Sequence, residues 1–130
     1  MLFRSTSRAS RLATVFDFEV LKQLLKHVGE DILMSSLEEF GAETGRLVKE
    51  MEEAKSGSDF ALLKSHAHTI KGNAATFGVN RMSNIARQME NDIKTDNIAA
   101  LTENLAFLKE ASAQFLDMYD LLHKDHEWKN

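Results

Sequence analysis

The chain has 130 residues, 43% hydrophobic and 28% charged, with a formal net charge of -4 at pH 7. This length suits one domain with a single core, and no apolar run approaches the ~20 residues of a membrane span. The negative charge argues against general nucleic-acid binding, which needs a basic surface. The absence of cysteine excludes disulfides and thiolate metal ligands, and it fits a cytoplasmic protein. Because proline is also absent, we expect long uninterrupted helices.

Residues 1–16 are predicted to form an N-terminal arm that is mobile or becomes helical against the rest of the protein. Arg4, Arg8 and Arg11 occur in this stretch with several serines and without an acidic residue until Asp17. Organellar transit peptides share this composition. Because the stretch is short, we favour an arm over a transit peptide.

A short helix and a long helix follow the arm. The short helix is predicted between Asp17, a residue suited to the N-cap, and Gly29, which can end a helix. The long helix begins at Glu30 and ends near the turn at residues 55–58. Its apolar stripe advances by fours and threes through Leu33, Leu37, Phe40, Thr44, Leu47, Met51 and Ala54. We interpret Gly41 and Gly45 as sites where a neighbouring helix packs closely.

Three more helices are predicted. A central helix runs from the cap Asp59 to Gly78, the next begins at the cap Asn80, and the last begins at Ile98. Their buried stripes are Phe60, Leu63, Ala67, Ile70, Ala74 and Phe77; Met82, Ile85, Ala86, Met89 and Ile93; and Ile98, Leu101, Leu105, Leu108, Ser112, Phe115, Tyr119 and Leu122. Short connections make successive helices antiparallel. The sequence therefore predicts an all-α fold, an antiparallel up-down four-helix bundle with a short additional N-terminal helix, over residues 17–126, and a tail at 127–130.

One imidazole stands out on the central helix. His68 projects roughly 130° from the centre of the buried stripe, so it points to solvent. Its neighbours at helical spacing are unusually small for an exposed face: Ala61, Ser65, Gly72 and Ala75, bordered by Lys64 and Lys71. A glycine inside a helix costs about 1 kcal/mol relative to alanine. We therefore interpret Gly72 as clearance for a macromolecule that approaches His68, and this face as a docking surface.

The pattern His-x-x-Lys-Gly, followed six residues later by Gly, occurs on this face as His68, Lys71, Gly72 and Gly78. It resembles the histidine phosphotransfer (HPt) domain family, and the resemblance covers nearly the whole chain. The resemblance implies that His68 is the phosphoacceptor, that Lys71 lies near its phosphoryl group and that Gly72 is the clearance residue. Asn73 stands where many members carry a small residue. The family's architecture is the same helical bundle.

The resemblance also implies the partners. They are a response-regulator receiver domain, with a phosphorylatable aspartate and an acidic Mg²⁺ site, and an upstream histidine kinase. No glycine loop for phosphates is present, so we expect neither nucleotide binding nor kinase activity of its own. We expect a phosphoryl carrier, not an enzyme, without intrinsic cofactor or metal, and we expect it to be a monomer. Two alternatives stay open. The chain could be the phosphotransfer domain of a larger hybrid or chemotaxis-type kinase, or a helical adaptor that is never phosphorylated.

Glu90 is the candidate orienter of the imidazole. His68 lies ten residues before Gly78 and Glu90 twelve after it, so the two share a level in an antiparallel pair. The resemblance to chemotaxis kinases implies a glutamate hydrogen-bonded to the phosphoacceptor histidine at this place. The alternative is a solvated glutamate.

Elsewhere, Glu50, Glu52 and Glu53 are interpreted as a solvated helix end, His66 as a residue beside the core, and Trp128 and Tyr119 as terminal packing.

Overall fold

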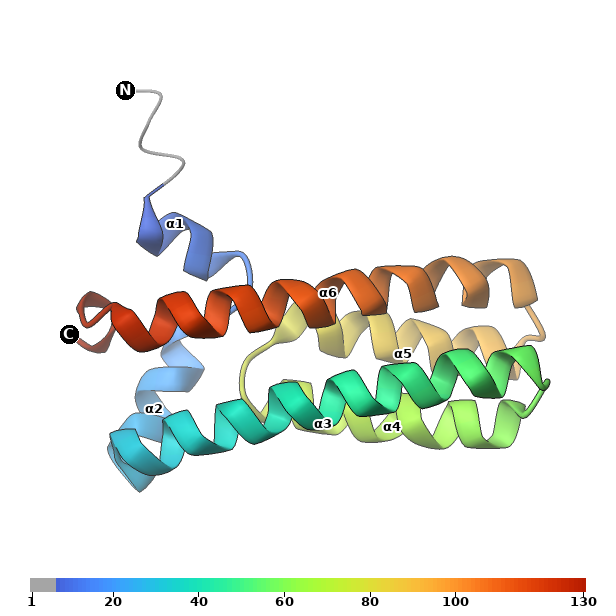
Figure 1. The fold of residues 1–130 in the computed structure, drawn as a ribbon, viewed down its shortest axis with the longest axis horizontal. Helices are drawn as coiled ribbons and strands as arrows, with labels where there is room; N and C mark the ends of the chain where they lie inside the picture. Colours follow the sequence, from blue (N-terminus) through green and yellow to red (C-terminus); the bar gives the residue numbers. More distant parts are fainter. Residues whose placement is uncertain (1–6) are drawn as a thin grey trace.

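The computed structural model describes residues 7–130. Its elements in chain order are α1 (Arg8–Ala13), α2 (Phe18–Val28), α3 (Glu30–Ser56), α4 (Phe60–Thr76), α5 (Asn80–Lys94), α6 (Ile98–Lys124) and the short 3₁₀ helix η2 (Glu127–Lys129). Helices α3 to α6 run side by side along the long axis of the molecule (Figure 1). Each of them packs against the two others that border it, which closes the bundle. The predicted all-α bundle is confirmed.

Capping side chains begin four of the six α-helices in the described part of the chain, namely α1, α2, α4 and α6. The carboxylate of Asp17 accepts a hydrogen bond from the amide of Glu19, and that of Asp59 accepts one from the amide of Leu62. The prediction for Asn80 was wrong by one residue, since Val79 occupies the N-cap and Asn80 is already helical. The reason lies in the turn, where the amide of Val79 donates to the carbonyl of Ala74 and so closes α4.

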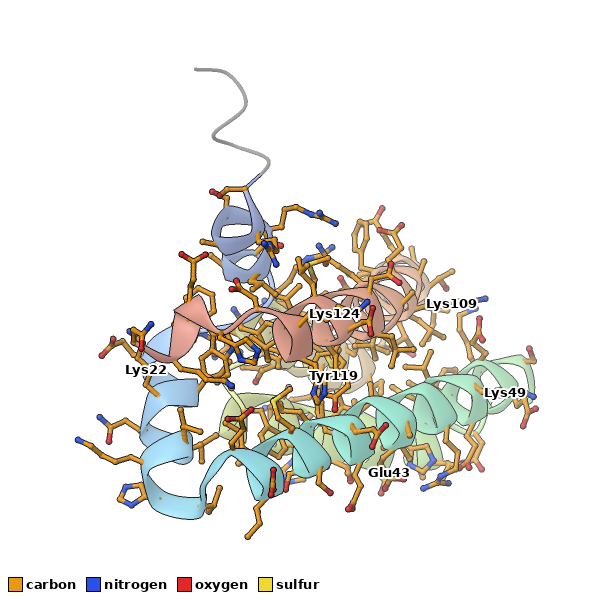
Figure 2. The ribbon with its side chains drawn as sticks, turned by 60° about the vertical axis from the view of Figure 1, so that its left-hand side comes forward. Lys22, Glu43, Lys49, Lys109, Tyr119 and Lys124 are labelled. Carbon is orange, nitrogen blue, oxygen red and sulfur yellow. The ribbon has the colours of Figure 1, made fainter. Side chains whose placement is uncertain are left out.

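The core follows the predicted stripes closely. Every stripe residue of α3 is buried. On α6 the prediction fails at Ile98, whose side chain is 39% exposed because it begins its helix at the open end of the bundle. Tyr119 lies between α6 and α3 (Figure 2) and donates from its hydroxyl to the carbonyl of Met34 over 3.1 Å. A partly buried polar contact that no apolar pattern predicts joins α5 to α6, where Asn104 donates to Asp92 over 2.7 Å.

The helices of the bundle differ in length, and this mismatch shapes one end of the molecule. α3 and α6 have 27 residues each, whereas α4 has 17 and α5 has 15. α1, α2 and η2 lie at the end where α3 and α6 extend past the α4–α5 turn (Figure 1). Short helices therefore cover apolar surface that α4 and α5 are too short to reach.

The folded core continues beyond both predicted limits, residues 17 and 126. Leu12 of α1 and the linker residue Phe16 are buried, and α1 packs on α6. Trp128 is buried as well, stacks on Phe18 at a centroid distance of 6.5 Å and donates to the carbonyl of Leu122. Residues 1–6 of the predicted arm lie outside the described residues.

The two glycines of α3 differ from each other. A Cβ atom at Gly41 would lie 2.9 Å from Cε2 of the buried Phe115, so close packing is the correct interpretation there. A Cβ atom at Gly45 would meet nothing within 4 Å, so the same interpretation was wrong for Gly45. The structure offers no packing reason for that glycine.

Gly78 ties the short helix α2 to the end of α4. Its φ of 71° belongs to the left-handed region that favours glycine, and a Cβ atom here would lie 2.9 Å from Cβ of Val20. Its carbonyl accepts a hydrogen bond from the amide of Asp17 over 3.0 Å. The turn that brings α5 back along α4 is thus held from outside by α2.

Candidate functional site

His68 lies midway along α4, on the face opposite the core. The buried residues of this helix are Leu63, Ala67, Ile70 and Ala74. Their spacing of three and four leaves the His68 side chain 71% exposed. A macromolecule can therefore reach the imidazole without any rearrangement of the bundle.

Glu90 of α5 contacts two side chains of α4. Its Oε2 lies 3.1 Å from Nδ1 of His68, and its Oε1 lies 2.6 Å from Nζ of Lys71. The contact anticipated from the chain positions is present. A carboxylate only accepts hydrogen bonds, so Nδ1 of His68 carries the proton and donates it to Oε2. In this tautomer Nε2 carries no proton, so its lone pair is available.

The register between α4 and α5 brings these groups together. The connection between the helices spans only residues 77–79, which fixes them as an antiparallel pair. Partway along the pair, the hydroxyl of Ser83 donates to the carbonyl of Lys71 over 2.9 Å. This bond holds the backbone of α4 at Lys71 against α5.

Two opposing effects act on the carboxyl group of Glu90, whose side chain is 17% exposed. Burial is the largest single effect and raises its pKa. Hydrogen bonds from Lys71 and His68, together with their charge, lower the pKa further than burial raises it, so the net pKa lies below the usual value. Glu90 is therefore ionised at neutral pH, as an acceptor for Nδ1 must be.

The surface around His68 is hollowed. An open hollow of about 360 Å³ is lined by Ala61, Lys64, Ser65, His68, Thr69 and Glu90. Lys71 does not line it. Gly72 and Ala75 continue the exposed small-residue face on the other side of His68, and a Cβ atom at Gly72 would meet nothing within 4 Å. The glycine is thus not required by packing inside the protein.

His66 has a separate environment on the side of α4 that faces α3. Its Nε2 lies 2.8 Å from Oε1 of Glu50, and Oε2 of the same carboxylate accepts from Arg46 over 2.6 Å. Sequence reasoning missed this α3–α4 link, although Arg46 and Glu50 have ion-pair spacing. The prediction of a solvated helix end was wrong for Glu50, which joins α3 to α4, and for Glu52, which reaches Lys109 of α6 over 3.2 Å. It is confirmed for Glu53, which is exposed.

Within residues 7–130, no three His, Cys, Asp or Glu side chains gather where they could hold a metal ion. Over the same residues, no helix has the length and apolar character required to cross a membrane.

The pH dependence of stability tests the charge of Glu90. Because its folded pKa lies below the usual value of 4.5, its stabilisation is complete above that pH and is lost as the pH falls through the folded pKa. We expect Glu90→Gln to lower the free energy of unfolding by about 1 kcal/mol at neutral pH. The difference from wild type should shrink as the pH falls below 4.5 and through the folded pKa. Urea unfolding of both proteins at several pH values measures this difference in the free energy of unfolding.

Glu103→Gln is the matched control, since Glu103 is exposed on α6 and forms no ion pair with any described residue. It should leave stability nearly unchanged throughout. An effect of Glu90→Gln that stays constant or grows as the pH falls below 4.5 would contradict the ionised, paired glutamate.

Comparison with known families supplies the context for this site. The model of the Hpt domain family matches residues 35–125, well over half of the chain, and the match contains His68, Lys71 and Glu90. Comparisons with curated proteins and with solved structures give no match. Hpt domains are phosphocarrier modules that work with receiver domains and kinases in phosphorelay signalling, through a phosphohistidine. This chain belongs to the Hpt domain family.

Proposed function

We propose that the protein carries phosphoryl groups on His68 in a multistep His–Asp phosphorelay. One receiver domain donates the group from its aspartyl phosphate, and the aspartate of a second receiver domain takes it. The observation that carries the proposal is the exposed imidazole of His68, with Nδ1 held by Glu90. A neutral imidazole in this orientation presents the lone pair of Nε2 to a partner.

The transfer step balances without a separate proton acceptor. Nε2 of His68 attacks the phosphorus atom, the new N–P bond forms, and the bond to the aspartate oxygen breaks. The aspartate leaves as a carboxylate with the electron pair. The ring keeps its proton on Nδ1 and becomes positively charged, and the carboxylate of Glu90 at 3.1 Å stabilises that charge.

The partner is proposed to supply the remaining catalysis. Phosphoryl transfer relies on positioning and on cations that neutralise the phosphoryl oxygens, commonly including a divalent metal. Among the described residues, the cations around His68 are the ammonium groups of Lys64 and Lys71. We assign the Mg²⁺ ion to the receiver domain, and we regard this chain as a carrier without intrinsic cofactor.

Docking is assigned to the exposed face around His68. Ala61, Ser65, Gly72 and Ala75 are all exposed on α4, and Lys64 borders them. From residue 61 to residue 75 the face extends about 21 Å along the helix. Small side chains keep it low, so the receiver domain can bring its aspartyl phosphate to Nε2. We propose that a monomer in the cytoplasm binds the receiver in this way.

The same site would also serve a phosphotransfer domain within a larger hybrid or chemotaxis-type kinase. The contact between Glu90 and His68 suits that alternative equally well. The source of the phosphoryl group distinguishes the phosphorelay carrier from the kinase domain. Rapid labelling by a kinase core, with none from phosphorylated receiver domains, would select the larger kinase, and a chain that accepts from neither would be an adaptor.

The first functional test compares the two histidines of α4. Purified wild type, His66→Gln and His68→Gln are each mixed with a phosphorylated receiver domain, and acid-labile label on the chain is measured. We expect label on wild type and His66→Gln and at least a hundredfold less on His68→Gln, because only His68 presents a free ring nitrogen on the exposed face. Label on His68→Gln at the wild-type level would refute the assignment.

The second test asks whether Gly72 provides clearance. Gly72→Gln should raise the free energy of unfolding by about 0.5 kcal/mol through helix propensity. It should also slow transfer from the receiver about tenfold, because the longer side chain stands in the docking face.

Gly45→Gln is the matched control, since Gly45 is exposed on α3 and equally free of neighbours. It should bring the same gain in stability with unchanged transfer. Equal transfer rates for Gly72→Gln and Gly45→Gln would show that Gly72 does not serve access.

A further inference from the structure

The two lysines beside His68 differ in what they contact. Nζ of Lys71 lies 2.6 Å from Oε1 of Glu90, and the Lys71 side chain is 32% exposed. Lys64 is exposed and lines the hollow beside His68. Its ammonium group forms no ion pair or hydrogen bond with any residue in the described part of the chain. Of the two lysines, only Lys64 therefore lies at the hollow with an ammonium group that has no partner among the described residues.

The direction of helical side chains places the reactive nitrogen on the side of Lys64. Side chains on an α-helix lean toward its N-terminus, so the imidazole of His68 covers the preceding turn, which holds residues 64 and 65. The lining of the hollow agrees, because Ala61, Lys64 and Ser65 precede His68 and neither Lys71 nor Gly72 takes part. With Nδ1 bound to Glu90, Nε2 is the ring nitrogen of His68 left to carry a phosphoryl group beside this hollow.

The hydroxyl groups of the hollow are unequally available. Thr69 already donates its hydroxyl to the carbonyl of Ser65 over 3.1 Å. The hydroxyl of Ser65 forms no hydrogen bond with another described residue, and so it can donate to a phosphoryl oxygen. An ammonium and a hydroxyl on one helical turn give a dianionic group a charged and a neutral donor.

We propose that Lys64 and Ser65 bind the phosphoryl group carried by His68, and that Lys71 acts only through Glu90 as a positioning residue. In that role Lys71 neutralises the carboxylate, which would otherwise repel an incoming phosphoryl dianion, and holds Oε2 against Nδ1. The inference rests on the proposed phosphoryl transfer to His68. It departs from the role that the family resemblance implies for Lys71.

A small phosphodonor separates phosphoryl binding from receiver docking. With phosphoramidate, Nε2 of His68 attacks phosphorus, the N–P bond of the donor breaks and ammonia leaves. The initial rate of phosphohistidine formation is measured for wild type, Lys64→Gln, Lys71→Gln and Lys49→Gln, each alone and combined with Glu90→Gln. Lys49, exposed on α3 (Figure 2), is the control for the change in net charge. Thermal unfolding checks that each variant is folded.

We expect Lys64→Gln to slow labelling about fivefold in both backgrounds, and less at high salt, because its cation acts on the phosphoryl group directly. Lys71→Gln should slow labelling in the wild-type background only, because Lys71 acts through its ion pair with the Glu90 carboxylate and Glu90→Gln removes that carboxylate. Lys71→Arg should restore the wild-type rate by keeping the ion pair. Lys49→Gln should match wild type within about twofold.

Two results would overturn the inference. One is a rate for Lys64→Gln equal to that for Lys49→Gln, and the other is a loss for Lys71→Gln that persists fully in the Glu90→Gln background. Failure of the proposed function has a different signature, because wild type itself would then acquire no label on His68 from either phosphoramidate or a receiver domain.

Discussion

The carboxylate of Glu90 is the group on which the site depends. It joins α5 to two side chains of α4, with Oε2 3.1 Å from Nδ1 of His68 and Oε1 2.6 Å from Nζ of Lys71. A carboxylate in a partly buried position is stable as an ion only when cations or donors compensate for lost solvation. Lys71 provides the compensation. The imidazole of His68 can then stay exposed while its Nδ1 is fixed by the carboxylate.

This arrangement requires α4 and α5 to keep their register. The left-handed Gly78 allows the tight turn between them, and α2 packs on that turn through Val20 and Asp17. Trp128 in turn stacks on Phe18 at the start of α2. The short helices at the end of the bundle thus support the turn that sets the level of Glu90, although they lie away from the imidazole.

Helical periodicity predicted those parts of the structure that depend on one helix at a time. The buried stripe of α3, the outward direction of His68 and the small residues around it all follow from the positions of residues on a single wheel. The level of Glu90 followed from counting across one short turn. Which side chains meet between two helices also depends on how each helix is rotated about its axis, and no single wheel contains that rotation. This is why the link from Glu50 to His66, and the pairing of Lys71 with Glu90 rather than with solvent, were not anticipated.

The sequence anticipated an arm that packs as a helix and terminal packing of Trp128, but not how far the buried core extends toward the ends of the chain. Leu12 and Trp128 belong to short segments with too few turns for a periodic pattern, yet both are buried because α3 and α6 outreach the helices between them. Gly45 shows the opposite limit, since a glycine in a helix indicates close packing only where a neighbour is present. The relative lengths of the helices and the neighbours of each residue are properties of the assembled bundle, and the pattern of a single helix does not contain them.

The tautomer of His68 tests the central claim most directly. Long-range ¹H–¹⁵N correlation spectra of the imidazole rings, recorded at a pH where the rings are neutral, show which nitrogen carries the proton. The Glu90 contact predicts that His68 is protonated on Nδ1 in the wild type and shifts toward the Nε2-protonated form in Glu90→Ala. A wild-type His68 that is protonated on Nε2, as in Glu90→Ala, would contradict the account, because the nitrogen assigned to phosphoryl transfer would then not be free.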